Sequence, residues 1–163
     1  MESKAKFLGH PIHPMLIVLP LGLFIAAVVF DGVYLWRGAA VFAMAAYLNI
    51  AAGIVGGLLA AVFGLIDWSA NPTGTRAKRI GLLHGAANVV VVLAFAIVWL
   101  LRGNRPEFTA TVPLFLLEVV ALLIGSIAGW LGGELVDRLG VGVDDGAHLD
   151  APSSLSGRPA RPR

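Results

Sequence analysis

The sequence predicts an all-α integral membrane protein, a four-helix bundle with both termini in the cytoplasm. Three observations predict it: the composition, four long apolar segments and the distribution of basic residues. Of 163 residues, 58% are hydrophobic and 13% are charged, whereas a soluble domain is about 45–50% apolar and about 25% charged. The chain has no cysteine, which excludes disulfide scaffolds, iron–sulfur clusters and thiol catalysis.

Four segments are long and apolar enough to cross a bilayer, whose core needs about 20 residues of apolar helix. They lack the alternation of a β-barrel strand and the polar stripe of a soluble bundle helix, so both classes are excluded. The predicted spans cover residues 14–36, 39–66, 80–101 and 112–131. The strongly polar residues inside them are Asp31, Asn49, His84, Asn88 and Glu118.

The first span is expected to be retained, because it is too long for a signal peptide and contains Pro20 and Asp31. Residues 1–143 are expected to form one transmembrane domain. No internal repeat with a convincing register is visible in it. Residues 144–163 are rich in Pro, Ser, Gly and Arg, which predicts a disordered tail.

The basic residues predict the orientation. The side that holds both termini carries Lys4, Lys6, Arg76, Lys78, Arg79, Arg138, Arg158, Arg161 and Arg163. The other side carries Arg37, Arg102 and Arg105. This bias places both termini in the cytoplasm. The net charge of +2 gives no reason to expect a nucleic-acid partner.

Two rows of small residues predict close helix packing, within one chain or between copies in a homo-oligomer. The row on the second span, in line with Asn49, is Gly53, Gly57, Ala60 and Gly64. The row on the fourth span, in line with Glu118, is Gly125, Gly129 and Gly133. Glu118 is expected to be protonated or paired inside the bundle.

Polar residues in a membrane are candidates for function because they are costly there. The candidates at the predicted cytoplasmic face are His10, His13, Asp67, His84 and, one turn from His84, Asn88. His10 and His13 each precede a proline, which disfavours the helical region and holds them in an extended entry segment. Harmless polar anchoring at the interface is the alternative interpretation.

The helix dipoles favour neutral imidazole at this face. The first and third spans both begin there, and their positive ends disfavour imidazolium at His13 and His84. Neutral imidazole is the form that binds metals. Asp67 lies at the end of the second span, where the helix dipole disfavours its negative charge. The charge therefore needs compensation, from an ion pair or a hydrogen bond to histidine. Alternatively, Asp67 orients a ligating histidine. His148 lies on the same side, in the tail.

Several motifs resemble an uncharacterised family of bacterial multi-pass membrane proteins, catalogued as domain of unknown function 2231. The motifs are Gly9-His10-Pro11-Ile12-His13-Pro14, Gly64-Leu65-Ile66-Asp67-Trp68, Leu83-His84-Gly85, Gly132-Gly133-Glu134-Leu135-Val136 and Gly140-Val141-Gly142-Val143. The resemblance extends to about residue 143. Some members look like fusions to a Rieske-type iron–sulfur domain, which implies a redox setting and names no activity. Many relatives carry an aromatic residue and a histidine where this chain has Asp137 and Leu139.

Three functions remain open. The first is an electron-transfer component that holds haem b or a divalent metal ion such as zinc. Haem would be held by His84 with His10 or His13, whereas zinc would need three or four ligands and would also use Asp67. The second is a non-catalytic accessory subunit, and the third is a small transporter or proton path through Glu118. Enzyme activity is not indicated, because the motifs of phosphate loops, dinucleotide sites and nucleophile elbows are absent.

Overall fold

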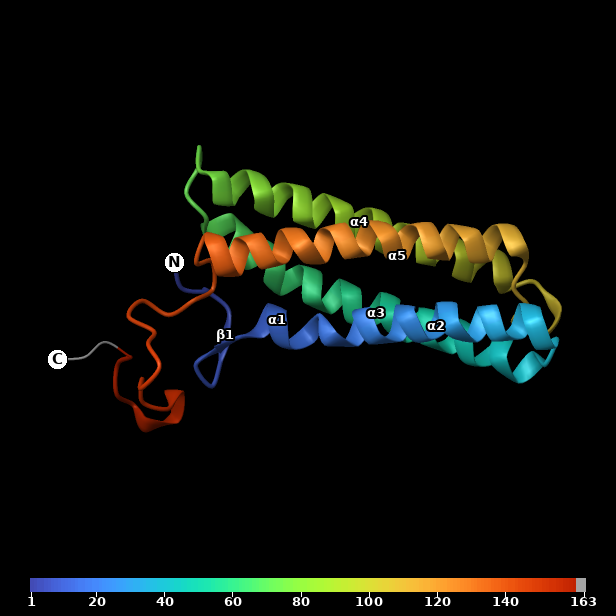
Figure 1. The fold of residues 1–163 in the computed structure, drawn as a ribbon, viewed down its shortest axis with the longest axis horizontal. Coiled ribbons are helices and arrows are strands. Elements are labelled where there is room, and N and C mark those ends of the chain that lie inside the picture. Colours follow the sequence, from blue (N-terminus) through green and yellow to red (C-terminus); the bar gives the residue numbers. More distant parts are fainter. Residues whose placement is uncertain (161–163) are drawn as a thin grey trace.

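The structure, a computed structural model, describes residues 1–160 as a bundle of long helices that lie side by side (Figure 1). The helices are α1 (Ile12–Leu16), α2 (Val18–Arg37), α3 (Ala40–Ala70), α4 (Arg76–Arg102) and α5 (Val112–Gly133). Within the described residues, four helical stretches are long and apolar enough to cross a membrane, namely Ile12–Arg37, Ala40–Ala70, Arg76–Arg102 and Val112–Arg138. The prediction of four membrane-crossing helices is therefore confirmed. Each helical stretch is longer than the predicted span, although α3 begins one residue after the predicted start.

The helices form two hairpins, the continuous stretch of α1 and α2 with α3, and α4 with α5, which run in the same sense (Figure 1). The N-terminus and residues 144–160, the last that the structure describes, lie at one end of the bundle, which we call the terminal end. The opposite end, with the α2–α3 and α4–α5 connections, is the loop end. The cytoplasmic placement of the terminal end remains a prediction.

Local sequence explains where the helices begin and end. Gly38 ends α2 in the left-handed conformation, with φ of 70°, a conformation that glycine adopts without a Cβ clash. Thr75 caps α4, and its side chain accepts a hydrogen bond from the Lys78 amide at 3.1 Å. A short 3-10 helix, η1 (Pro106–Phe108), fills the connection between α4 and α5.

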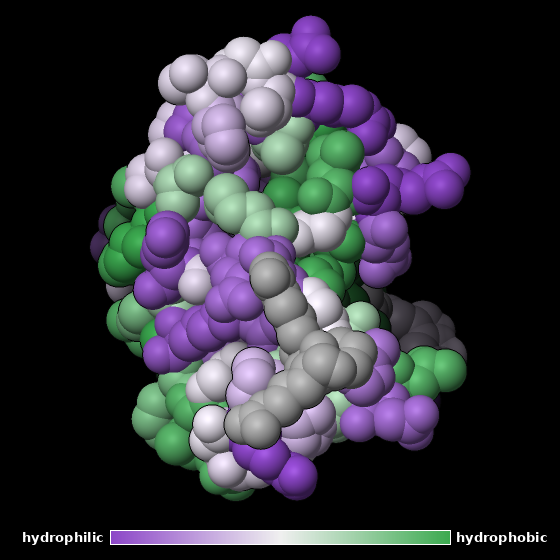
Figure 2. Space-filling model, turned by 90° about the vertical axis from the view of Figure 1, so that its left-hand side faces the viewer, coloured by the Kyte–Doolittle hydropathy of each residue, from purple (hydrophilic) through white to green (hydrophobic). Residues whose placement is uncertain are grey.

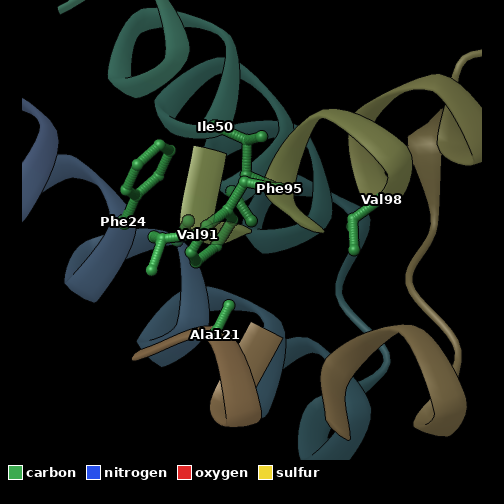
Figure 3. Packing of buried hydrophobic residues seen from close by; sticks show 8 residues of the cluster. Phe24, Ile50, Val91, Phe95, Val98 and Ala121 are labelled. Carbon is green, nitrogen blue, oxygen red and sulfur yellow. The ribbon is translucent and has the colours of Figure 1, made fainter. Parts of the chain in front are cut away.

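The apolar core lies in the middle of the bundle and draws on all four long helices (Figure 3). Its labelled residues are Phe24, Ile50, Val91, Phe95, Val98 and Ala121. The rings of Phe24 and Phe95 stack with centroids 4.0 Å apart and planes 3° apart. Leu, Val and Ile side chains on the outer faces are exposed, as expected for surfaces that contact lipid.

The two hairpins repeat each other. On their first helices, residues at equal spacings along the chain form three pairs: His13 with His84, Phe24 with Phe95, and Asp31 with Arg102. On their second helices the matched positions are Ile50 with Glu118, Ala60 with Ala128, and Gly64 with Gly132. The three first-helix pairs meet across the bundle, as two ring contacts and an ion pair.

The expectation that the chain has no internal repeat is therefore wrong. Only a few matched positions carry distinctive residues, and one of these pairs matches an acid with a base. The remaining positions hold interchangeable apolar residues, which give no register. A parallel repeat of this kind places the pseudo-two-fold axis along the bundle, as in transporters built from parallel halves.

The glycine row on α3 packs as predicted, whereas the row on α5 does so only in part. A Cβ on Gly53 would lie 2.6 Å from the Phe24 ring. On α5, Gly125 faces Val91, but a Cβ on Gly129 would meet nothing within 4 Å. Gly132, rather than the predicted Gly133, makes the close approach to α4.

The terminal end is covered by the segments that flank the bundle. Strands β1 (Lys6–Phe7) and β2 (His10–Pro11) pair antiparallel. Lys6 forms ion pairs with Glu2 and Asp144. Of the predicted disordered tail, the structure describes residues 144–160, which include a 3-10 helix, η3 (Ser154–Ser156), and a hydrogen bond of 3.0 Å from Ser154 to the Leu8 carbonyl. Residues 161–163 lie outside the described part.

Candidate functional site

Two of the predicted site residues, His13 and His84, meet near the terminal end of the bundle. His13 lies on α1 and His84 on α4, so each belongs to a different hairpin. Their ring centroids are 6.1 Å apart and their planes are inclined by 85°. Both rings are half-buried. The predicted gathering of imidazoles from separate stretches of chain is found for this pair.

Each imidazole is oriented by a hydrogen bond to a backbone carbonyl of its own hairpin. His13 Nδ1 lies 2.8 Å from the Ala60 oxygen on α3, and His84 Nδ1 lies 2.8 Å from the Ala128 oxygen on α5. Because a carbonyl can only accept, each Nδ1 carries the proton. In the neutral ring, Nε2 is then the atom with the free lone pair.

A glycine makes room for each ring. Gly64 and Gly132 stand one helical turn after the carbonyls that accept these hydrogen bonds. A Cβ on Gly64 would lie 2.9 Å from the His13 ring, and one on Gly132 would lie 3.3 Å from the His84 ring. The motif of an alanine followed four residues later by a glycine therefore forms a notch that holds the imidazole.

Asn88 contacts His84, as the shared helix face predicts. Its Nδ2 donates to the His84 carbonyl oxygen at 2.9 Å and lies 3.3 Å from His84 Nε2. An amide N–H beside Nε2 is compatible with an unprotonated Nε2. Asn88 therefore supports the same tautomer that the Ala128 carbonyl selects.

Asp67 and His10 do not join the pair. The Asp67 carboxylate accepts from Ser3 Oγ at 2.8 Å, from the Lys4 amide at 2.8 Å and from the Ala5 amide at 3.4 Å. His10 Nε2 lies 3.4 Å from Ser154 Oγ. Asp67 thus receives its compensation from the N-terminal segment, and not from a histidine or a cationic side chain. Within residues 1–160, no group of three or more His, Cys, Asp or Glu could hold a metal ion.

Polar residues surround the terminal end (Figure 2). Arg76 Nη2 pairs with Glu134 Oε2 at 2.6 Å, which joins the start of α4 to the π-helix η2 (Glu134–Arg138). Lys78 Nζ lies 3.9 Å from the centroid of the Trp68 ring and donates to the Trp68 carbonyl. These basic residues, expected as determinants of topology, also tie the ends of the helices together.

A charged cluster near the loop end is the feature that the sequence analysis missed. Asp31, Arg102 and Glu118 each have 0% of their surface exposed. In the sequence, Asp31 stands out only as a polar residue inside the first span, and Arg102 only as one of the basic residues outside the spans on the loop side. The equal spacing of Asp31 from His13 and of Arg102 from His84 is the signal that could have paired them.

Four long apolar helices with exposed aliphatic faces define a polytopic membrane protein that lies in a lipid bilayer. The chain belongs to the family catalogued as domain of unknown function 2231, described as a predicted membrane protein, whose profile matches residues 9–145. No curated protein and no solved structure matches the chain. The predicted family is therefore confirmed.

Proposed function

We propose that this protein is an electron-transfer component of the bacterial inner membrane that holds haem b between His13 and His84. One observation carries the proposal: two imidazoles from different hairpins meet edge to face, and each is held through Nδ1, which leaves Nε2 as the nitrogen that could bind a metal. Metal-bound histidines almost always donate their other ring N–H to an oxygen in this way.

The spacing of the rings suits two imidazoles that would bind one metal ion between them. A metal–imidazole bond is about 2.0–2.1 Å. Two such bonds and the two half-rings account for the separation of 6.1 Å between the centroids. Haem b can be held by histidines on facing helices without any cysteine. When bound, the haem iron would supply one-electron transfer.

Neither hydrogen bond of the two histidines joins one hairpin to the other, so the distance between the hairpins can change without breaking them. His13 bonds to α3 and His84 bonds to α5, so each ring is fixed to its own hairpin. A ligand inserted between the rings would therefore break neither bond. The glycines let each ring pack closely against the second helix of its own hairpin.

A zinc site of the predicted composition is less favoured. Structural and catalytic zinc sites use three or four protein ligands. Asp67 is occupied by the N-terminal segment, and His10 lies beside Ser154. The pair therefore suits a centre that takes two protein ligands, as haem b does.

The proposed location and partner rest on the sequence. The excess of basic residues at the terminal end supports cytoplasmic termini, which places the histidine pair near the inner leaflet. The resemblance supports a Rieske-type iron–sulfur protein as the partner in electron transfer.

The test is the absorption spectrum of the purified protein in detergent, before and after titration with hemin. We expect a Soret band that shifts on reduction with dithionite, as for an iron with two axial imidazoles. The band should be lost in His13→Ala and in His84→Ala. It should be unchanged in His10→Ala, which is the matched control because His10 lies outside the pair.

A folded protein that binds no hemin would overturn the proposal. Binding that survives both the His13→Ala and the His84→Ala change would also overturn it, because the ligands would then lie elsewhere. Circular dichroism of each variant shows whether the helices are retained.

A non-catalytic accessory subunit is the second candidate. It is favoured by the fact that each histidine already joins two helices of its hairpin through a hydrogen bond. In that case the variants would lose stability, and the wild-type protein would bind no hemin. The titration therefore separates the two functions.

A further inference from the structure

The buried cluster near the loop end begins with a complete ion pair. Arg102 Nη1 and Nη2 donate to the two carboxylate oxygens of Asp31, at 2.5 and 2.9 Å. Arg102 also donates from Nη2 to the Ala43 carbonyl at 2.9 Å and from Nε to the Phe108 carbonyl at 2.8 Å. One guanidinium and one carboxylate thus neutralise each other in bidentate geometry.

Glu118 is a second carboxyl group in the same cluster. Its Oε1 lies 3.5 Å from Arg102 Nη1, at the limit of a hydrogen bond. That contact uses the last of the five N–H donors of the guanidinium. Glu118 Oε2 is buried and has no hydrogen-bond partner within the described residues.

The charges of the cluster do not balance if both carboxyl groups are ionised. Asp31 and Glu118 would then carry two negative charges against one positive charge on Arg102. A net charge inside a site with no exposed surface is strongly unfavourable. A proton on Glu118 makes the cluster neutral and supplies an O–H donor beside the carboxylate of Asp31.

The repeat shows that the packing does not require an acid at this position. The matching residue of the first hairpin is Ile50, which is buried in the apolar core. An aliphatic side chain therefore suits this place in the helix. Since Asp31 and Arg102 already complete their ion pair, the carboxyl group of Glu118 adds to the cluster only the contact of Oε1 with Arg102 Nη1 at 3.5 Å.

We propose that Glu118 is a buried proton-binding site. A proton from water forms an O–H bond at Oε2 and returns to water on release, so no oxidant or reductant is involved. The charged groups that face it are Asp31 from α2 and Arg102 from α4, while α3 contributes the Ala43 carbonyl. The titratable side chain of α3 at this end, Tyr47, stacks between Trp99 and Phe108.

The proton is exchanged with the loop end of the bundle. The apolar core, with the stacked rings of Phe24 and Phe95, separates the cluster from the histidine pair. Asn49, the polar residue in the second span, donates to the Ala45 carbonyl of its own helix at 2.8 Å. The site therefore does not depend on the proposed haem.

Infrared spectroscopy of the full-length protein in lipid nanodiscs tests the proposal. We expect the carbonyl band of a protonated carboxylic acid at neutral pH, with a shift in heavy water. Labelling glutamate with carbon-13 should shift the same band in the wild-type protein. The band should be lost completely in Glu118→Gln and in Glu118→Ile, which copies Ile50, and retained in Glu107→Gln, a change in the exposed loop.

Absence of the band from the folded wild-type protein would overturn the proposal. A band that does not respond to labelled glutamate would assign the proton to an aspartate and would overturn it equally. The labelling experiment needs no variant, so a failure of Glu118→Gln to fold leaves the test intact.

Discussion

The histidine pair and the Asp31–Arg102 pair each join matching positions of the two hairpins, yet the two pairs are built differently. The histidines are half-buried, and each is bonded within its own hairpin. The ion pair is fully buried and joins α2 to α4, with a further bond from Arg102 to Ala43 on α3. The loop end therefore holds the hairpins together, whereas neither hydrogen bond of the histidine pair joins one hairpin to the other.

This difference follows from the symmetry of the fold. Two copies of one residue that meet on a pseudo-two-fold axis form a matched pair, which suits a ligand with two equal faces. An acid and a base on the same axis form a neutral pair, which can be buried when its hydrogen bonds are complete. The same backbone arrangement thus gives a candidate ligand site near the terminal end and an ion pair that holds the hairpins together near the loop end.

Removal of the cation should have the largest effect. Arg102→Ala leaves Asp31 and Glu118 buried together without a positive charge, and breaking a buried pair costs about 3–5 kcal/mol. We expect a corresponding loss in the free energy of unfolding, measured by denaturant titration in detergent. Glu118→Gln is the control within the cluster and should change the stability by less than half as much.

Exchange of the two charges sharpens this comparison. Asp31→Arg combined with Arg102→Asp keeps the net charge and uses matched positions of the repeat. We expect the double variant to be more stable than Arg102→Ala. A double variant that is no more stable than Arg102→Ala would show that the bonds of Arg102 to the Ala43 and Phe108 carbonyls, and not the charge balance, provide most of the stabilisation.

Filling the glycine notches should have the next largest effect. A Cβ at Gly64 would lie 2.9 Å from the His13 ring, so Gly64→Ala must displace that ring. Overpacking of this kind costs about 1–3 kcal/mol. Gly132→Ala, with a distance of 3.3 Å to the His84 ring, should cost less. Thermal unfolding and hemin affinity measure both consequences.

Gly129→Ala is the matched control on α5, because a Cβ there would meet nothing within 4 Å. It should be neutral or stabilising by up to about 1 kcal/mol, as alanine favours a helix. An equal loss of stability in Gly64→Ala and Gly129→Ala would show that the close approach of Gly64 to the His13 ring is not the cause of the loss.

Removal of the imidazoles should have a smaller effect on stability. Each of His13→Ala and His84→Ala loses one hydrogen bond to a carbonyl, worth about 0.5–1.5 kcal/mol. Because the two rings also contact one another, the losses should not add, and we expect a coupling of about 0.5 kcal/mol or more in the ligand-free protein. A double-mutant cycle by denaturant unfolding measures this, and strict additivity would contradict the contact between the rings.

Much of the fold is predictable from the sequence, because the backbone of a long, continuous apolar run can satisfy its hydrogen bonds in lipid only as a helix. His13 and His84 are predictable as a pair, since both lie at the start of spans that enter from the same side. The partners of Asp67 are not predictable, because backbone amides of residues 4 and 5 leave no mark in the sequence. The Asp31–Arg102 pair depends on which helices face each other, and only the repeat reveals that register.

The ion pairs of the terminal segment should have the smallest effect. The hydrogen bonds with Asp144 and then Glu2 raise the pKa of Lys6 above its ordinary value. The stabilisation is therefore complete below the ordinary pKa of lysine and is lost as the pH rises through the raised pKa. Because the partners are partly exposed, Asp144→Asn should cost less than about 1 kcal/mol, and less at high salt. Unfolding at neutral pH in low and high salt measures this. A loss as large as that of Arg102→Ala would mean that the terminal segment, and not the buried ion pair, holds the bundle together.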